Sequence, residues 1–333
     1  MKKNNIYIFY AKCIALCLPF IILVLLYMAK DPFMVIRHYN DYDHCRVCQS
    51  EGAVAWTKYK MLRNKMHYDS FIMGNSCTKA FPCKDWNRYI HARPFRLFSN
   101  GEGLGDLCLK LEALDHQHNQ PVRNLLIITE KDFFENVNPQ NSIMHIMPID
   151  VSNKSLISYQ TAFLQGFFDP KFLFPYLKYQ ITDRYDNSMR GVVNEHIPVH
   201  TYYANDAVLP AEDSIRIEGE NFWMSKQWMK EKKKKAKSSV ASRVICSTQI
   251  KRLNEIENFC ERHHTDMKLV IGTNYKREAV NPLDVKTLKS IFGNNNVFDY
   301  SSSPLKMDYH NYYDNVHYRV TVGKKIMKEI YRV

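Results

Sequence analysis

Short apolar runs alternate with helical patterns from residue 67 to the C-terminus of this 333-residue chain. Five runs have the length of a buried strand and end in Gly, Asn, Ser or a charged residue: 70–73, 95–98, 125–129, 268–272 and 297–300. Such alternation is typical of a parallel sheet covered by helices on both faces. The pattern therefore predicts an α/β fold with three α/β/α layers around a mainly five-stranded parallel sheet.

Helical spacing of apolar residues fills the gaps between these runs. It predicts a helix at 107–114, between the second and third runs, and a last helix at 316–331. About 130 residues separate the third run from the fourth, far more than such a connection needs, so we expect an inserted subdomain at about 134–265. Its aromatic stretch at 163–179, which we expect Pro170 and Pro175 to break, suits the packing of a lid better than stacking on a sugar.

The N-terminus carries the longest apolar segment. Residues 13–29 are 17 positions without a charge, and Lys2, Lys3 and Lys12 precede them. Extended by apolar residues at 6–10, this segment can cross a hydrocarbon core of roughly 30 Å. We predict a membrane anchor at 1–30, a stalk and packing helix at 31–66, and a domain at 67–333. The basic N-terminal side favours an extracytoplasmic domain, in a periplasm or at the cell surface; a cleaved signal peptide is the alternative.

Charge and cysteine content narrow the classes of function. The net charge of +12 suits an anionic partner, but part of it lies in a lysine-rich run at 226–237, typical of a solvated surface. An exported chain without a nucleic-acid-binding motif is not expected to bind nucleic acid. Cys45 and Cys48 form a CxxC, but zinc needs a second ligand pair, so a local disulfide and two free thiols are the alternatives. We expect no metal and no cofactor.

The first apolar run ends abruptly in Gly74-Asn75-Ser76, where a new helical pattern begins. In an open parallel sheet, ligands bind beyond the carboxyl ends of the strands, where helix N-termini converge. A serine at this junction is therefore exposed to substrate. Because the same residues also make a good helix cap, the junction alone allows either a structural role or a nucleophile.

A second polar group follows the fifth run. Asp314 and His317 lie three residues apart at the predicted start of the last helix. This spacing places a carboxylate beside an imidazole, which are the orienting acid and the general base that a serine hydroxyl needs before it can attack. Because parallel strands end at the same edge of a sheet, the sequence predicts a triad of Ser76, His317 and Asp314.

Three motifs together resemble the blocks of the SGNH (GDSL-like) hydrolase superfamily, over roughly residues 67–333. Gly74-Asn75-Ser76 is similar to the GDS block, with Asn75 where Asp is usual, the stretch 99–107 is similar to the second block, and Asp314 to His317 is similar to the last, DxxH block. The resemblance implies a flavodoxin-like sheet, with Ser76 as nucleophile, His317 as base and Asp314 as its orienter. It also implies that the amides of Ser76 and Gly105 donate to the oxyanion.

The asparagine of the family's third block has no clear counterpart. Gly272-Thr273-Asn274 spells the GxN of that block but follows the fourth run, whereas the family places the asparagine after the third strand. Lys131 or Asp132 lies near that place here. Only Lys131 can donate while charged, and an ionised Asp132 would repel an oxyanion. Asn274 also lies at the carboxyl end of a strand and can face the pocket.

The architecture resembles that of superfamily members that assist acyl transfer to cell-envelope polymers, such as the D-alanyl transfer protein of teichoic acids and the acetylation proteins of alginate. The resemblance implies a cell-envelope polysaccharide or other acylated glycan as substrate and a membrane-bound O-acyltransferase as partner. We therefore expect an extracytoplasmic serine esterase or O-acyltransferase that forms an acyl-serine intermediate. The alternative is a non-catalytic envelope protein of this fold that binds a glycan or a partner.

Overall fold

The computed structural model describes residues 2–234, 240–275 and 278–331 of the chain. These residues form two compact units. The first consists of Met1–Gln49 together with Lys154–Ile197, and the second of Ser50–Asn153 together with Pro198–Val333. The segment expected as one insertion, at about 134–265, is thus divided between the two units.

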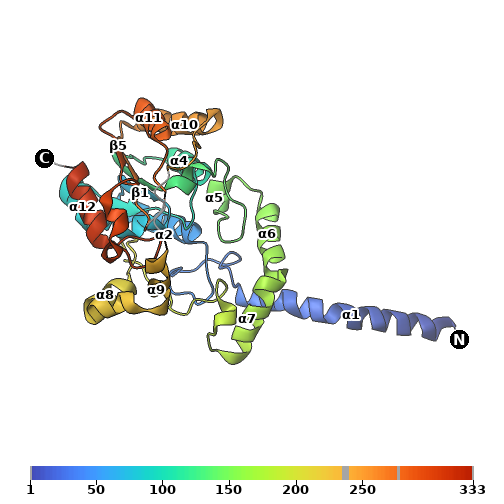
Figure 1. Ribbon diagram of the computed structural model, residues 1–333. Helices are drawn as coiled ribbons and strands as arrows, with labels where there is room; N and C mark the ends of the chain where they lie inside the picture. The colour runs from blue at the N-terminus through green and yellow to red at the C-terminus, as the bar shows by residue number, and fades with distance from the viewer. Residues whose placement is uncertain (1, 235–239, 276–277, 332–333) are drawn as a thin grey trace. The chain divides into compact units, whose positions relative to one another are not determined.

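The first unit consists of a long N-terminal helix and a pair of shorter helices beside its C-terminal half (Figure 1). Its elements are α1 (Lys2–Lys30), α6 (Leu156–Phe168), α7 (Pro170–Thr182) and the short helix η3 (Asn187–Met189). Aromatic rings join them, since Tyr27 contacts Phe167 and Phe33 contacts both Phe163 and Phe172. The stretch Ile6–Lys30 of α1 is long and apolar enough to cross a membrane.

The aromatic stretch at 163–179 is helical on both sides of Pro170. Pro170 is the first residue of α7, a position at which its missing N–H leaves no hydrogen bond unmade. Pro175 lies inside α7 and does not end it. The prediction that both prolines break the stretch is therefore wrong for Pro175. In the same unit, Cys45 and Cys48 are free thiols.

The second unit is built on five parallel strands in the order β2-β1-β3-β4-β5. The strands are β1 (Ser70–Gly74), β2 (Pro94–Arg96), β3 (Asn124–Thr129), β4 (Asp266–Ile271) and β5 (Val297–Asp299). Each begins and ends within two residues of a predicted apolar run. The predicted α/β class with a five-stranded parallel sheet is therefore confirmed.

Helices cover both faces of this sheet. The helical elements of the unit are α2 (Glu51–Met66), η1 (Ser76–Ala80), α3 (Cys83–Ile90), α4 (Leu104–Asp115), η2 (Lys131–Phe134), α5 (Ile149–Ser152), α8 (Pro210–Glu218), η4 (Gly219–Met224), α9 (Lys226–Lys233), α10 (Ser247–His263), α11 (Pro282–Phe292), η5 (Pro304–Met307), η6 (Tyr309–Asn311) and α12 (Val320–Ile330). Residues 235–237 of the lysine-rich run lie outside the described residues.

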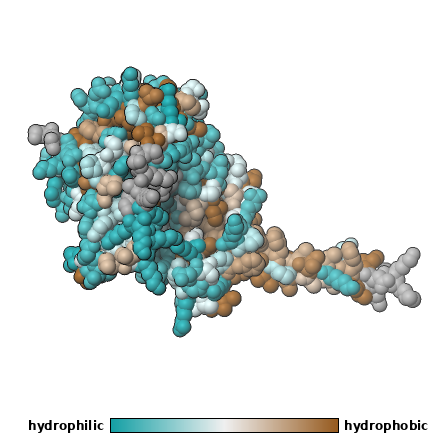
Figure 2. Space-filling model, in the orientation of Figure 1, coloured by the Kyte–Doolittle hydropathy of each residue, from teal (hydrophilic) through white to brown (hydrophobic). Residues whose placement is uncertain are grey.

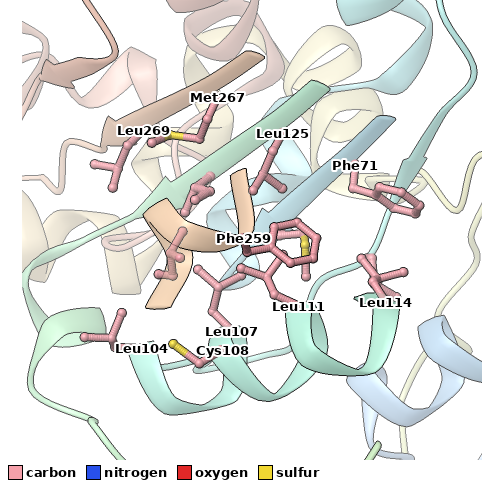
Figure 3. Close-up of a cluster of buried hydrophobic side chains, with 14 of the residues drawn as sticks. Phe71, Leu104, Leu107, Cys108, Leu111, Leu114, Leu125, Phe259, Met267 and Leu269 are labelled. Atoms are coloured by element: carbon pink, nitrogen blue, oxygen red, sulfur yellow. The ribbon is translucent and has the colours of Figure 1, made fainter. Parts of the chain in front are cut away.

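Alternate residues of each strand enter opposite hydrophobic cores, as the pleat of a sheet requires. Phe71 and Leu125 pack with α2, α4, α10 and α11 on one face (Figure 3). Ile72 and Leu126 pack with η1, α3 and α12 on the other face. Burial on both faces explains why the strands are continuous apolar runs in the sequence.

The last helix begins later than the apolar spacing predicts. It starts at Val320 rather than at residue 316, so Asp314 and His317 lie in the turn before it and not in its first turn. Buried Tyr312 and Tyr318 pair through an antiparallel bridge on either side of this turn. The tyrosine pairing takes these residues out of the helix and makes the turn a closed loop.

Candidate active site

The first strand brings Ser76 to the carboxyl edge of the sheet through a turn that needs glycine. Gly74 has a φ of 125°, which lies in a region that L side chains rarely adopt. A Cβ at this position would lie 1.9 Å from the carbonyl oxygen of Ile128 on β3. The backbone angle and the close approach of the neighbouring strand therefore both require glycine.

Asn75 caps the short helix η1, of which Ser76 is the first residue. Its Oδ1 accepts a hydrogen bond from the amide of Cys77 at 2.9 Å. Its carbonyl oxygen accepts another from the amide of Thr78 at 3.1 Å. The cap that the sequence suggests is thus formed by Asn75, and this leaves the half-buried Ser76 in the first turn of η1 without a capping role.

One carboxylate both folds the turn before α12 and orients its histidine. Asp314 Oδ1 accepts hydrogen bonds from the amides of Val316 at 2.8 Å and His317 at 2.7 Å. This pattern is the local turn that aspartate side chains favour. The second oxygen, Oδ2, lies 2.7 Å from Nδ1 of His317.

The His317 ring connects this turn to the first strand. Its Nε2 lies 2.7 Å from Oγ of Ser76, a residue 241 positions away in the sequence. The side chains of His317 and Asp314 are 24% and 33% exposed, so solvent and small solutes can reach the cluster. The structure thus brings the three predicted residues together in the order hydroxyl, imidazole, carboxylate.

The surroundings of this cluster keep the carboxylate charged and the ring in place. Burial acts to raise the pKa of Asp314, but the hydrogen bonds from the ring of His317 and from the amides of His317 and Val316 outweigh it and hold that pKa below its usual range. The ring of Tyr313 stacks on the imidazole, with centroids 5.5 Å apart and planes 3° from parallel. A carboxylate fixed at Nδ1 holds a proton there, which leaves Nε2 free to accept the proton of Ser76.

Gly105 is not placed as an oxyanion donor, and this prediction is corrected. Its amide donates to the carbonyl oxygen of Asn136 at 3.0 Å. A Cβ at Gly105 would lie 2.4 Å from the backbone of Asn138. The glycine therefore lets residues 136–138 pass closely over the start of α4. Packing explains the glycine here, although the sequence around it resembles the second block of the superfamily.

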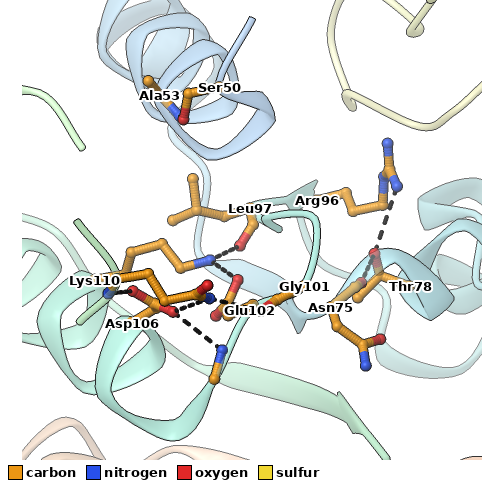
Figure 4. Close-up of polar contacts among 12 residues, drawn as sticks. Ser50, Ala53, Asn75, Thr78, Arg96, Leu97, Gly101, Glu102, Asp106 and Lys110 are labelled. Carbon is orange, nitrogen blue, oxygen red and sulfur yellow. Dashed lines mark hydrogen bonds and ion pairs between the residues drawn. The ribbon is translucent and has the colours of Figure 1, made fainter. Parts of the chain in front are cut away.

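A buried ion pair fixes the loop that leads from β2 to α4 (Figure 4). Lys110 and Glu102 have fully buried side chains, and Nζ of Lys110 lies 2.5 Å from the carboxylate of Glu102. The same ammonium group donates to the carbonyl oxygen of Leu97 at 2.8 Å. Because the amide of Ser99 donates to the carbonyl of Gly74 at 3.2 Å, this loop is held against the end of β1.

Two hydrogen-bond donors of Ser76 and the residue before it are unused. Among the residues that the structure describes, none accepts a hydrogen bond from the backbone N–H of Ser76 or from Nδ2 of Asn75. The first group belongs to Ser76 itself and the second to the preceding residue in the chain. They are the donors that remain for a negative charge that develops beside Ser76.

The residues considered for a further oxyanion donor have other contacts. Lys131 pairs with Glu135 at 3.3 Å, one turn along the chain. Asn274 donates through Nδ2 to Oε2 of Glu130 at 2.8 Å. Glu130, the first residue after β3, also accepts a hydrogen bond from the thiol of Cys77. Burial, together with this carboxylate, raises the pKa of the Cys77 thiol well above its usual value.

Sequence reasoning missed Glu130 and Lys79. Position alone was the signal for both, since Glu130 directly follows a predicted strand and Lys79 lies three residues after Ser76, on the same side of a 3₁₀ turn. Lys79 forms no hydrogen bond or ion pair with another residue in the described part of the chain. Burial lowers its pKa, and Asp314 is among the charges that act on it.

A cavity of about 350 Å³ lies between α4 and α10, away from this cluster. Both arginines of its lining are already paired, Arg262 with Asp115 at 2.6 Å and Arg252 with Glu255 at 2.8 Å. Its lining contains no serine or histidine. We therefore place the candidate chemistry at Ser76.

The cluster at Ser76 has the parts needed for nucleophilic catalysis at an acyl carbon: a reachable hydroxyl, a base within hydrogen-bond distance and an ionised group that orients the base. In the described part of the chain, no group of His, Cys, Asp and Glu is arranged to hold a metal ion. Comparisons with models of known protein families and with curated proteins found no match.

Proposed function

We propose that this protein is a serine esterase or O-acyltransferase that works through an acyl-Ser76 intermediate. The observation that carries the proposal is the hydrogen-bonded chain from Ser76 through His317 to Asp314, in which both links measure 2.7 Å. A nucleophile after β1 and an acid–base pair after β5, at one edge of a parallel sheet, also support the resemblance to the SGNH hydrolase superfamily.

In the acylation step, Oγ of Ser76 attacks the carbonyl carbon of an ester while its proton passes to Nε2 of His317. Asp314 stabilises the imidazolium that forms. The tetrahedral intermediate collapses when His317 returns this proton to the leaving oxygen, so an alcohol departs and an ester bond to Ser76 remains. Water or a sugar hydroxyl then gives its proton to His317, attacks the acyl carbon and releases the serine.

The amide of Ser76 and Nδ2 of Asn75 stabilise the oxyanion in this scheme. One donor belongs to Ser76 and the other to the residue before it, and neither has another partner among the described residues. A single donor of this kind contributes about 3 kcal/mol, because charge accumulates on the oxygen only in the transition state. Asn75 thus takes the role that an asparagine after the third strand has in the superfamily.

The same proposal places the domain outside the cytoplasm on a retained anchor. A signal sequence would also meet the length and hydropathy of Ile6–Lys30. Packing favours retention, because the ring of Tyr27 lies 5.2 Å from that of Phe167 and Tyr27 is buried. A leader that is removed makes no such contacts with the finished chain. Its removal would expose the aromatic faces of α6 and α7.

An acylated cell-envelope polysaccharide is the substrate class that the resemblance favours, with a membrane-bound O-acyltransferase as partner. The net charge of +12 suits a polyanionic glycan. Lys79, one turn from the nucleophile, lies over the ring of Phe98 and forms no hydrogen bond or ion pair with another described residue. We assign it the binding of an acidic group on the glycan near the reacting ester.

Activity-based labelling tests the proposal. Full-length protein in detergent is treated with a fluorophosphonate, digested and mapped by mass spectrometry. We expect one adduct on Ser76, abolished in Ser76→Ala and strongly reduced in His317→Ala. The matched control is Ser99→Ala, which removes a different serine, itself buried, near the same strand end. Labelling that persists in Ser76→Ala would exclude the acyl-serine mechanism.

A second candidate function is that of a non-catalytic protein that binds a glycan or a partner at the same edge. It is favoured by the occupied amide of Gly105 and by the carboxylate of Glu130 beside Cys77. An occupied amide cannot donate to an oxyanion, and a nearby carboxylate does not stabilise its negative charge. Unlabelled wild type that still binds an acylated envelope glycan, equally well in Ser76→Ala, would favour this function.

A further inference from the structure

We infer that α6 and α7 form a membrane-interface hairpin, whose exposed apolar side rests at the level of the lipid headgroups and upper acyl chains beside α1. This inference rests on the proposed retention of α1 as an anchor. It commits to lipid as the occupant of this surface. Three properties of this hairpin support the inference: its contacts with α1, its low content of charged residues, and the apolar residues that it leaves exposed.

The hairpin contacts α1 inside the apolar segment. The ring of Phe168, the last residue of α6, stacks on Phe20 with centroids 4.7 Å apart and planes 14° from parallel. One helical face of α1 is the contact surface, since Leu23, Val24 and Tyr27 are partly or fully buried while most of α1 is exposed. Phe20 precedes Lys30 by ten residues, or about 15 Å along the axis.

The length of α1 sets the level of the membrane surface. From Ile6 to Leu23 there are 18 residues, which span about 27 Å and nearly match a hydrocarbon core of about 30 Å. The boundary of that core therefore falls between Phe20 and Tyr27, where the hairpin packs. Aromatic side chains concentrate at such boundaries, and the first unit places a cluster of five there: Tyr27, Phe33, Phe163, Phe167 and Phe172.

The composition of the hairpin suits this level. The 13 residues of α6 contain no charged side chain. α7 has only two charged side chains, Lys171, which can extend toward headgroups, and Lys178, which pairs with Asp186 at 2.6 Å. Asp169, between the two helices, caps α7 by accepting from the amide of Lys171 at 2.9 Å. Its exposed charge keeps the corner at headgroup level and prevents deeper insertion.

Large apolar side chains of both helices are left exposed by the residues that the structure describes. Ile157 is 80% exposed, Phe174 is 67% exposed and Ile181 is 85% exposed. Ile157 is eleven residues before Phe168, on the same side of α6, so this exposed stripe leads to the contact with α1. Figure 2 shows that apolar surface also dominates α1 itself. A bilayer that accepts α1 accepts these side chains without any further protein surface.

Lipid photolabelling tests this inference on the full chain. The protein is reconstituted in phosphatidylcholine–phosphatidylglycerol vesicles that contain a phospholipid with a diazirine in its acyl chain. After irradiation, adducts are mapped by mass spectrometry. We expect adducts on α1 and on α6 and α7, at least about fivefold above those on Ile217, a similarly exposed residue of the second unit, 76% exposed.

A matched variant distinguishes lipid contact of the hairpin from nonspecific labelling of exposed apolar side chains. Ile157→Asp/Phe174→Asp changes two exposed side chains and leaves the buried ring contacts intact, so the fold should survive. We expect hairpin adducts to fall to the level of Ile217 while α1 remains labelled. Ile217→Asp is the control and should change nothing in the hairpin.

The outcomes are distinguishable from those of the proposed function. Adducts on α1 but not on the hairpin overturn the inference and leave the anchor and the serine mechanism standing. A hairpin that is not labelled in these vesicles but is buried in native membranes would contact a protein partner. That outcome would also overturn the inference. Absence of α1 adducts overturns both anchor and hairpin, whereas phosphonate labelling of Ser76 reports separately on the chemistry.

Discussion

Two polar clusters lie close together near the carboxyl edge of the sheet and differ in one respect, their access to solvent. The triad (Ser76, His317, Asp314) has links of 2.7 Å and side chains that are 24% and 33% exposed at its histidine and aspartate. The buried pair (Glu102, Lys110) has a link of 2.5 Å and no exposure at all. Short polar contacts thus occur both in a cluster that is partly exposed to solvent and in one that is fully buried.

The difference in access separates chemistry from stability. A buried ion pair has lost its hydration, so each charge depends on the other and removal of either is costly. A half-exposed triad keeps water as an alternative partner, so its members can change without loss of the fold, and a substrate can replace that water. We therefore expect variants of the triad to affect activity alone and variants of the buried pair to affect stability first.

Ser76→Ala should have the largest effect. If Ser76 is the proposed nucleophile, its loss is expected to lower kcat by roughly 10⁶-fold, as in serine enzymes whose triad acts as a unit. The melting temperature should stay within about 2 °C of wild type, because Ser76 forms no structural cap. Steady-state hydrolysis of a p-nitrophenyl ester and thermal unfolding measure both quantities. A marked fall in melting temperature would contradict the separation between the two clusters.

Asp314→Asn should follow, with a loss of about 10⁴-fold in kcat. The amide can still accept the hydrogen bonds that close the turn, but its NH₂ group cannot hold Nδ1 of His317 in the protonated form. The imidazolium would also lose its counter-charge. The same ester assay measures this effect, and His310→Gln, which alters an exposed histidine outside the triad, is the control. Full activity in Asp314→Asn would remove it from the mechanism.

Lys110→Met should have the largest effect on stability. The variant leaves Glu102 buried without its cation, so we expect a loss of about 3–5 kcal/mol in unfolding free energy by urea denaturation. The double variant Glu102→Gln/Lys110→Met, which removes both charges, should recover part of this loss. A single variant as stable as wild type would show that the pair is not closed to water.

Asn75→Asp should lower kcat by about 10²-fold, near 3 kcal/mol in the transition state. The aspartate keeps an oxygen for the amide of Cys77, so η1 remains capped, but the unused Nδ2 donor is lost. Asn75→Ala would mix this effect with loss of the cap. Ester hydrolysis and thermal unfolding are the measurements. Unchanged kcat in Asn75→Asp would assign the oxyanion to backbone donors alone.

The last expected effect is the pH dependence of the buried pair. Burial raises the pKa of Glu102 to about 7 despite the nearby Lys110. Between roughly pH 4.3 and that value, the folded protein keeps a proton that the unfolded chain has released. The unfolding free energy of wild type should therefore fall, relative to Glu102→Gln, as pH rises through this window. A difference that is constant between pH 5 and pH 8 would refute the shift.

Local sequence determined the strands, the N-terminal helix, the helix of the second block and the positions of Ser76, Asp314 and His317. Burial on both faces makes each strand a continuous apolar run, and this signal needs no knowledge of distant contacts. The pairing of Ser76 with His317, 241 residues apart, could also be predicted, since parallel strands that carry them end at one edge. This rule depends on the topology of the sheet alone, and it does not depend on the side chains of the intervening residues.

Only the tertiary structure decided what the remaining motif residues contact. The amide of Gly105 is occupied because residues 136–138, from a distant part of the chain, pass over the start of α4. Glu130 reaches Cys77 and Asn274 because three loops meet at the sheet edge. The turn at Asp314 stays out of α12 because Tyr312 and Tyr318 pair across it. A residue's type records which hydrogen bonds it can make; the packing of distant segments decides which of them are already taken.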